Sequence, residues 1–69
     1  MPDYPIIRRL DGKYEQQLVN GWLCEYWEEP GTALWRVDVY LNDVPEWVSV
    51  GHSSLEEAEQ AAHDYIDQL

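Results

Sequence analysis

The stretch from Ser53 to Leu69 constrains the fold of this chain more than any other part of its sequence. Ser54 followed by Glu57 is the pattern of a capping box, in which a hydroxyl and a carboxylate satisfy free backbone N–H groups where a helix begins. Beyond this cap, apolar residues recur at steps of three and four, which is the period of one helix face. These residues are Leu55, Ala58, Ala62, Tyr65, Ile66 and Leu69. The sequence therefore predicts an amphipathic helix over residues 54–68, and its apolar stripe has to pack against another element.

Three segments ahead of this helix have strand patterns, and together they predict an antiparallel sheet over residues 17–50. The clearest is segment 33–41, whose side chains alternate as they do in a strand with one buried face. One side carries Trp35, Val37, Val39 and Leu41, and the other carries Leu34, Arg36, Asp38 and Tyr40. Segments 17–28 and 46–50 are predicted as its neighbours, because Pro30-Gly31 and Asn42-Asp43 are turn sequences on either side of it.

The dipeptide Asn20-Gly21 leaves two alternatives for the first of these segments. It is either a tight hairpin turn between two short strands or a bulge within one longer strand. Residues 1–13 contain Pro2 and Pro5, so we expect an extended N-terminal segment there. Ile6 and Ile7 within it form a short edge strand or pack across one end of the sheet.

The order of these elements predicts one α+β domain over residues 1–69. It is a three-stranded antiparallel β-meander with one C-terminal α-helix packed on one face. We expect the apolar side of segment 33–41 to meet the helix, because one helix covers only one face of a sheet. The opposite side, with Arg36, Asp38 and Tyr40, is then solvated, covered by residues 1–13, or a contact surface.

The charge of the chain is strongly negative and unevenly distributed. Its 69 residues include 14 acidic and 4 basic side chains, for a formal net charge of −10. Only Asp3 and Asp11 of the acids lie in residues 1–13, whereas Arg36 is the only base after them. Direct binding to nucleic acid or to an anionic membrane needs Lys and Arg, so this distribution argues against both. It favours a basic protein partner.

The residues that usually carry catalysis or bind metals are isolated in this sequence. Cys24 is the only cysteine, and neither His52 nor His63 has a companion His or Cys at metal-ligand spacing. We expect Cys24 to be a small core-facing or half-buried residue and both histidines to be exposed. The sequence therefore predicts no enzyme, no metal site and no cofactor. A lone cysteine and the lack of a signal peptide or membrane-length apolar run predict a soluble, cytoplasmic protein.

The arrangement of acidic residues is the remaining feature that indicates a function. Carboxylates recur on the polar side of the predicted helix and in the predicted turns, and aromatic side chains accompany them on the sheet. Such a field imitates a few phosphates of DNA, which carries one charge per about 1.7 Å of duplex. The candidate partner-binding residues are Glu28, Glu29, Asp43, Glu46, Glu56, Glu57, Glu59, Asp64, Asp67, Tyr40 and Trp47, with Tyr26 as a further candidate for an exposed aromatic.

Residues 33–66 resemble, in order of elements, the small β-β-β-α domains with which phage integrases bind arm sites through their sheet. The resemblance includes a third strand that leads into a capped helix with Glu-Ala pairs. Those domains carry basic residues on the sheet, whereas this chain has only Arg36 there. The resemblance therefore implies the shape and not the DNA-binding function.

By size, charge and architecture, the whole chain resembles small acidic anti-CRISPR proteins encoded by phages. The resemblance is carried by the acidic helix 56–67, the turns 28–29 and 43–46, and the aromatic candidates named above. Several of these inhibitors are DNA mimics that occupy a basic DNA-binding surface of a Cascade-type complex. The resemblance implies a type I inhibitor that acts in the cytoplasm of the host bacterium.

The expected function is therefore a non-enzymatic inhibitor whose acidic surface blocks a basic nucleic-acid-binding surface of a CRISPR-Cas complex. The expected partner is an effector subunit or another basic DNA-binding protein, without direct contact to nucleic acid. The alternative is a small homodimeric interaction module that pairs through its uncovered sheet face, where Arg36 and Asp38 of two copies would cross-pair.

Overall fold

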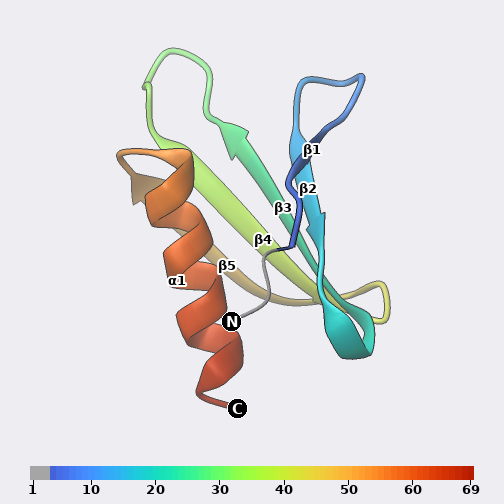
Figure 1. Cartoon of the computed structure of the whole chain (residues 1–69). Coiled ribbons are helices and arrows are strands. Elements are labelled where there is room, and N and C mark those ends of the chain that lie inside the picture. The colour runs from blue at the N-terminus through green and yellow to red at the C-terminus, as the bar shows by residue number, and fades with distance from the viewer. Residues whose placement is uncertain (1–3) are drawn as a thin grey trace.

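The fold is an antiparallel sheet with a helix packed on one face (Figure 1). The computed structural model describes residues 4–69, so the first three residues of the predicted extended segment lie outside the described part. The elements are strands β1 (Ile7–Arg8) and β2 (Tyr14–Gln17), the 3-10 helix η1 (Val19–Gly21), strands β3 (Trp22–Glu28), β4 (Trp35–Leu41) and β5 (Val44–His52), and helix α1 (Leu55–Asp67).

The sheet formed by residues 4–69 has five strands, so the predicted count of three is wrong. The strand order is β1-β2-β3-β4-β5, and each strand is antiparallel to its neighbours. The α+β class and the antiparallel meander followed by a C-terminal helix are confirmed. The two further strands come from residues 7–17, where Gln16 of β2 lies opposite Cys24 of β3. The sequence of strand β2 is Tyr-Glu-Gln-Gln, which contains too few apolar residues to show the alternating pattern that predicts a strand.

The dipeptide Asn20-Gly21 forms a turn, so the hairpin alternative is correct. Strand β2 ends before it, β3 begins after it, and the Leu18 N–H donates to the Trp22 carbonyl at 2.9 Å. Asn20 has φ 62° and Gly21 has φ 85°, and this left-handed region is open mainly to Gly and Asn. The Asn42 N–H also donates to the Gly21 carbonyl at 3.0 Å, which joins this turn to the turn between β4 and β5.

The hydrophobic core lies between β3, β4 and α1; the sequence predicted the contributions of β4 and α1 but not that of Tyr26 on β3. Val37 and Val39 of β4 and Ala58 and Ala62 of α1 are fully buried, together with Cys24 and Tyr26 of β3. The small alanines let the helix approach the sheet closely. The helix residues Leu55, Tyr65 and Ile66 and the strand residues Trp22, Trp35 and Trp47 pack around this centre. The predicted contact between the apolar side of β4 and the stripe of the helix is therefore confirmed.

Strand β5 forms one edge of the sheet and determines where the helix begins. Its last residue, His52, lies opposite Trp35, the first residue of β4, so α1 begins near the turn between β3 and β4. The pairing of β4 with β5 is irregular at two points, between Trp35 and Val37 and between Val39 and Tyr40. Such bulges are common on edge strands, where they oppose pairing with another chain.

No helix within residues 4–69 combines the length and the apolar character needed to cross a membrane.

Candidate functional site

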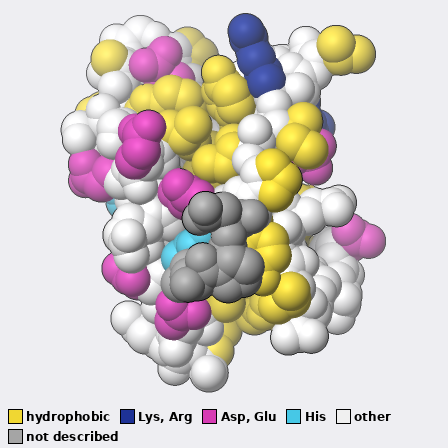
Figure 2. All heavy atoms as spheres, in the orientation of Figure 1, with side chains coloured by type: hydrophobic (Ala, Val, Ile, Leu, Met, Phe, Trp, Pro, Cys, Tyr) yellow, Lys and Arg dark blue, Asp and Glu magenta, His cyan; other side chains and the backbone are white. Residues whose placement is uncertain are grey.

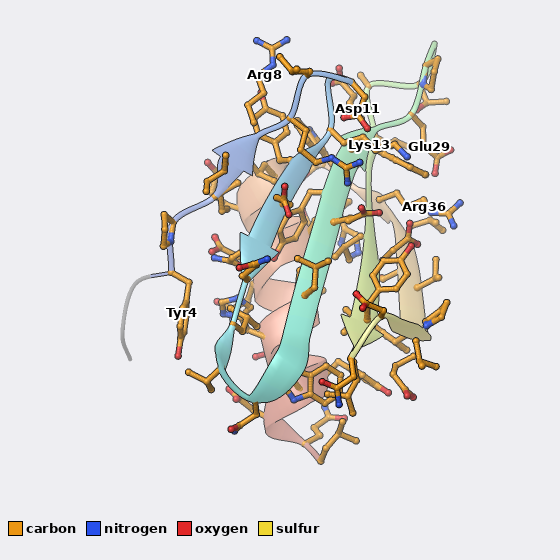
Figure 3. All side chains as sticks on the ribbon, turned by 90° about the vertical axis from the view of Figure 1, so that its right-hand side faces the viewer. Tyr4, Arg8, Asp11, Lys13, Glu29 and Arg36 are labelled. Carbon is orange, nitrogen blue, oxygen red and sulfur yellow. The ribbon has the colours of Figure 1, made fainter. Side chains whose placement is uncertain are left out.

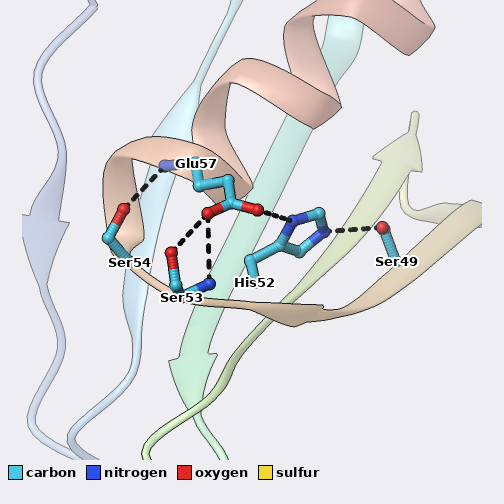
Figure 4. Close-up of polar contacts among 5 residues, drawn as sticks. All are labelled: Ser49, His52, Ser53, Ser54 and Glu57. Carbon is cyan, nitrogen blue, oxygen red and sulfur yellow. Dashed lines mark hydrogen bonds and ion pairs between the residues drawn. The ribbon is translucent and has the colours of Figure 1, made fainter.

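The first turn of α1 is fixed by a cluster of polar side chains (Figure 4). The Ser54 hydroxyl accepts a hydrogen bond from the Glu57 N–H at 3.1 Å, as the predicted capping box requires. The Glu57 carboxylate accepts hydrogen bonds from the N–H and the hydroxyl of Ser53, one residue before the cap. These bonds to Ser53 are the main reason that the pKa of Glu57 lies below its ordinary value.

The same cluster ties the end of strand β5 to the helix. His52 Nε2 and the Ser49 hydroxyl are 2.6 Å apart, and His52 Nδ1 is 3.7 Å from the Glu57 carboxylate. His52 is therefore largely enclosed, with a side chain 13% exposed, and the expectation of an exposed histidine is wrong for it. A hydroxyl, an imidazole and a carboxylate are in contact here in the order Ser49, His52, Glu57, as in the triad of a hydrolase. A substrate would need a cavity beside them, but the main cavities in residues 4–69 are lined by other residues. We interpret the cluster as an anchor between β5 and α1.

The outer face of α1 carries the candidate carboxylates that stay in solvent. Glu56, Glu57, Asp64 and Asp67 are exposed, and Gln60 lies between them and donates to Asp64 at 2.9 Å. Glu56, Gln60 and Asp64 are spaced by four residues, so they follow one ridge of the helix. Figure 2 shows acidic side chains along the α1 side of the molecule. We call Glu56, Glu57, Asp64 and Asp67 the acidic helix face.

The basic side chains lie away from this face, on the β1–β2 side and on the uncovered face of the sheet. Arg9 pairs with Glu25 and, at 3.0 Å, with Asp11. Arg36 pairs with Asp38 at 3.1 Å. Figure 3 shows the bases Arg8, Lys13 and Arg36 at one end of the sheet. Among residues 4–69, no Lys or Arg forms an ion pair with a carboxylate of α1. The acidic helix face therefore has no Lys or Arg counter-charge within the described chain, and only Glu57 contacts a histidine, His52.

Glu59 and His63 do not belong to this exposed face, although the sequence placed them on it. Both are half-buried and turn toward the sheet, where they meet Gln16 of β2. The Gln16 amide nitrogen donates to Glu59 at 2.7 Å, and its oxygen lies 2.9 Å from His63 Nε2. A buried glutamine on an unpredicted strand gives these polar helix residues an interior partner. Glu59 is therefore a structural residue, and the expectation that His63 is exposed is wrong.

The turn acids are not gathered into one patch with the helix. Glu28 and Glu29 lie at the turn between β3 and β4, whereas Asp43 lies in the turn between β4 and β5. The length of β4 separates these turns, and seven residues of strand span about 23 Å. Glu46 is exposed on the edge strand β5. The turn between β3 and β4 is the one near the start of α1.

Two of the three aromatic candidates belong to the hydrophobic core or pack against it. Tyr26 is fully buried, and burial raises the pKa of its phenol. Trp47 stacks on Tyr65 of α1 with ring centroids 4.6 Å apart and an angle of 2° between the planes. On β4, Val39 lies opposite Trp47 and Tyr40 lies opposite Pro45, and the pairing of β4 with β5 is irregular between these two positions. Tyr40 is half-buried on the uncovered sheet face, where burial and the nearby Glu25 and Asp38 raise the pKa of its phenol.

The uncovered sheet face is neither fully solvated nor covered by a second layer. Arg9, which follows β1, reaches across to Glu25, while Lys13, which precedes β2, lies over the Trp27 ring with Nζ 3.6 Å from the centroid. Arg36 is 5.1 Å from the same ring. Arg9 and Arg36 are thus paired with carboxylates, whereas Lys13 contacts an aromatic ring. Sequence reasoning missed this arrangement because strand β2 was not predicted, although three of the four bases lie in residues 8–13.

In residues 4–69, no three His, Cys, Asp or Glu side chains converge in a way that would hold a metal ion. Cys24 is fully buried, which is the first of the two placements expected for it, and burial raises the pKa of its thiol to about 11. The thiol therefore stays protonated at neutral pH and is a poor nucleophile.

Comparison of the chain with models of known protein families, with curated proteins and with solved structures finds no match.

Proposed function

We propose that this protein is a non-enzymatic inhibitor that uses its acidic helix face to occupy a basic, nucleic-acid-binding surface of another protein. The observation that carries the proposal is the separation of charge across the molecule. The carboxylates of α1 have no Lys or Arg partner among the described residues, whereas Arg9 and Arg36 are engaged on the sheet. A surface with unneutralised charge attracts an oppositely charged surface and speeds the encounter with it.

The dimensions of the acidic helix face suit a few phosphate-binding side chains of a partner. Glu56 and Asp67 are separated by about 17 Å along the helix axis. A helix presents these carboxylates on a rigid element, so the partner does not have to order them on binding. The capping contacts of Ser54 and Glu57 hold the end of the helix where this face begins.

The partner that we propose is the DNA-binding surface of a Cascade-type CRISPR-Cas effector. This choice rests on the resemblance in size, charge and architecture to acidic anti-CRISPR proteins. The test is an electrophoretic mobility assay in which the purified effector binds a labelled target duplex. We expect the protein to lower the bound fraction of DNA, and to do so less at high salt because the attraction is screened.

The variant that tests the site replaces Glu56, Asp64 and Asp67 with Lys, and inhibition should be lost. Glu59 is left unchanged because Gln16 depends on it. The matched control replaces Glu28, Glu29 and Asp43 with Lys, which changes the net charge equally but leaves the helix intact. We expect this control to inhibit like the parent. Equal loss in both variants would reject the helix face as the site, and an effector that binds DNA normally beside the parent protein would reject the proposed target.

A second candidate function is a homodimeric interaction module that pairs through the uncovered sheet face. Two exposed valines of edge strand β5 favour it, because Val48 and Val50 are 48% and 57% exposed and share one side of the strand. Arg36 already pairs with Asp38 in the same chain, so apolar contact rather than cross-pairing would drive association. Sedimentation velocity decides between the two candidates: a dimer that Val48→Lys dissociates supports the module, and a monomer at all salt concentrations rejects it.

A further inference from the structure

A groove opens at one end of the sheet, between the β1–β2 connection and the turn between β3 and β4. Its volume is about 650 Å³, which lies within the usual range of small-molecule sites. Tyr14, Trp35 and Pro30 supply apolar wall, and the Tyr14 and Trp35 rings contact each other with centroids 5.8 Å apart. Arg8, Lys13 and Glu28 supply charged groups. None of the residues that line the groove belongs to the acidic helix face, so the groove can be tested separately from the function proposed for that face.

The two basic groups of the groove differ from the other two bases of the chain. Lys13 is held over the Trp27 ring, which also lines the groove, and the aromatic face fixes the ammonium group without neutralising it. Arg8 is exposed and forms no ion pair within residues 4–69. Both side chains therefore keep donors for an external anion. Figure 3 shows Arg8 and Lys13 at the same end of the sheet.

The acidic groups of the groove divide in a similar way. Asp11 is already engaged, because it pairs with Arg9 at 3.0 Å and accepts a hydrogen bond from the Lys13 N–H at 3.0 Å. Glu28 forms no ion pair within the described chain and is exposed at the end of β3. A carboxylate with free acceptors binds hydroxyl groups well, and an acidic side chain that binds a ribose diol is a recurrent arrangement in nucleotide sites.

We propose that this groove binds a ribonucleoside monophosphate. The base lies against Trp35 and Pro30, the ribose hydroxyls donate to Glu28, and the phosphate accepts hydrogen bonds from Lys13 and Arg8. Each part of the ligand thus has a complementary group in the lining. A longer nucleic acid is disfavoured, because two bases cannot offset the repulsion of a chain with net charge −10. An acidic peptide would match the bases and the aromatic wall but would leave Glu28 without a partner.

The four tryptophans of the chain provide the readout. Their indole N–H signals in a ¹H–¹⁵N spectrum report on the groove through Trp27 and Trp35 and on remote sites through Trp22 and Trp47. The probes are AMP, GMP, CMP and UMP, with inorganic phosphate and adenosine as partial ligands. We expect the monophosphates to shift the Trp27 and Trp35 signals in a saturable manner and to leave the other two in place. Phosphate or adenosine alone should bind more weakly.

Lys13→Gln should weaken binding about tenfold, as expected for loss of a charge-assisted hydrogen bond. Gln68→Glu, at the exposed end of α1, changes the net charge by the same amount and should leave the affinity unchanged. Arg8→Gln provides a second test at an exposed residue, in case Lys13→Gln disturbs Trp27. The proposal is overturned if none of the four nucleotides shifts Trp27 and Trp35, if inorganic phosphate binds as well as they do, or if Gln68→Glu weakens binding as much as Lys13→Gln. Shifts produced only by a short acidic peptide would also overturn it and would assign the groove to a peptide.

Discussion

The Tyr26 hydroxyl donates a hydrogen bond to the side-chain oxygen of Gln16 at 2.8 Å, and both side chains are almost completely excluded from solvent. The amide nitrogen of Gln16 donates to Glu59 of α1 and to the Tyr4 carbonyl. One glutamine therefore joins strands β2 and β3, the helix and the chain before β1. In residues 4–69, no buried side-chain nitrogen or oxygen lacks a hydrogen-bond partner, so this polar centre is fully satisfied.

Replacing Gln16 with Leu should lower the free energy of unfolding by about 2–3 kcal/mol, because the buried Tyr26 hydroxyl would lose its acceptor. Urea denaturation followed by tryptophan fluorescence measures the change. Gln17→Leu is the matched control: it makes the same replacement at the next, exposed position of β2 and should change the stability by no more than about 0.5 kcal/mol. Equal effects at the two positions would show that the Gln16 contacts do not contribute.

The stacked rings of Trp47 and Tyr65 should be energetically coupled. Trp47→Ala and Tyr65→Ala should each destabilise the protein, and the double variant should be more stable than the sum of the two predicts, with a coupling energy of about 1 kcal/mol. Tyr14 supplies the comparison, because it lies on β2, three strands away from β5. Trp47→Ala and Tyr14→Ala should be additive. A coupling energy near zero for Trp47 and Tyr65 would contradict the stacking as a source of stability.

The contacts of Glu57 should make the stability depend on pH in the acid range. Hydrogen bonds from Ser53 keep the folded-state pKa of Glu57 below its ordinary value of 4.5. The unfolded state then binds the proton more readily, so the contribution of Glu57 is fully present above pH 4.5 and is lost as the pH falls through the folded pKa. Thermal unfolding measured from neutral to acid pH should therefore show a smaller loss for Glu57→Gln than for the parent. Glu56→Gln, which removes a neighbouring exposed carboxylate without these bonds, should follow the parent. If Glu57→Gln has the same acid sensitivity as the parent, the contacts do not act on stability.

The sequence predicted the parts of this fold that depend on apolar periodicity and capping. Ser54, Glu57 and the stripe from Leu55 to Ile66 gave the helix to within about one residue at each end. The apolar side of β4 likewise predicted the face that meets the helix. These signals are local, so each can be read without knowing what lies opposite.

The features that sequence reasoning missed depend on partners distant in the chain. Strand β2 buries Gln16 rather than an apolar residue, and its partners Tyr26, Glu59 and His63 come from β3 and α1. From the sequence alone, a polar residue on the polar side of a helix is expected to be exposed. Its burial becomes predictable only when the buried side chain that hydrogen-bonds to it, here the Gln16 amide, is known. The candidate site was affected in the same way. The sequence placed Glu59 on the exposed side of the helix, whereas in the structure it is half-buried against Gln16. The other helix candidates, Glu56, Glu57, Asp64 and Asp67, are exposed as predicted.

The close approach of Gly21 to Asn42 gives a final prediction, on how two turns of the sheet fit together. A Cβ at Gly21 would lie 2.1 Å from Asn42 Oδ1, and the φ of 85° adds strain for any L side chain. Gly12 has a similar φ of 88° but open space around it, so Gly12→Ala isolates the cost of the backbone conformation. Gly21→Ala should therefore destabilise the protein by at least about 1 kcal/mol more than Gly12→Ala, because the steric conflict is added to the strain.

The steric part of this cost is relieved if Asn42 is shortened in the same chain. Asn42 has φ 50°, so Asn42→Gly is compatible with its backbone conformation. In the Gly21→Ala background it should restore stability to about the level of Gly12→Ala, as measured by urea denaturation. If Gly21→Ala and Gly12→Ala were equally destabilising, the Asn42 side chain would have moved aside at little cost. The packing between the two turns would then not fix their relative position, and only the hydrogen bond from the Asn42 N–H to the Gly21 carbonyl would join them.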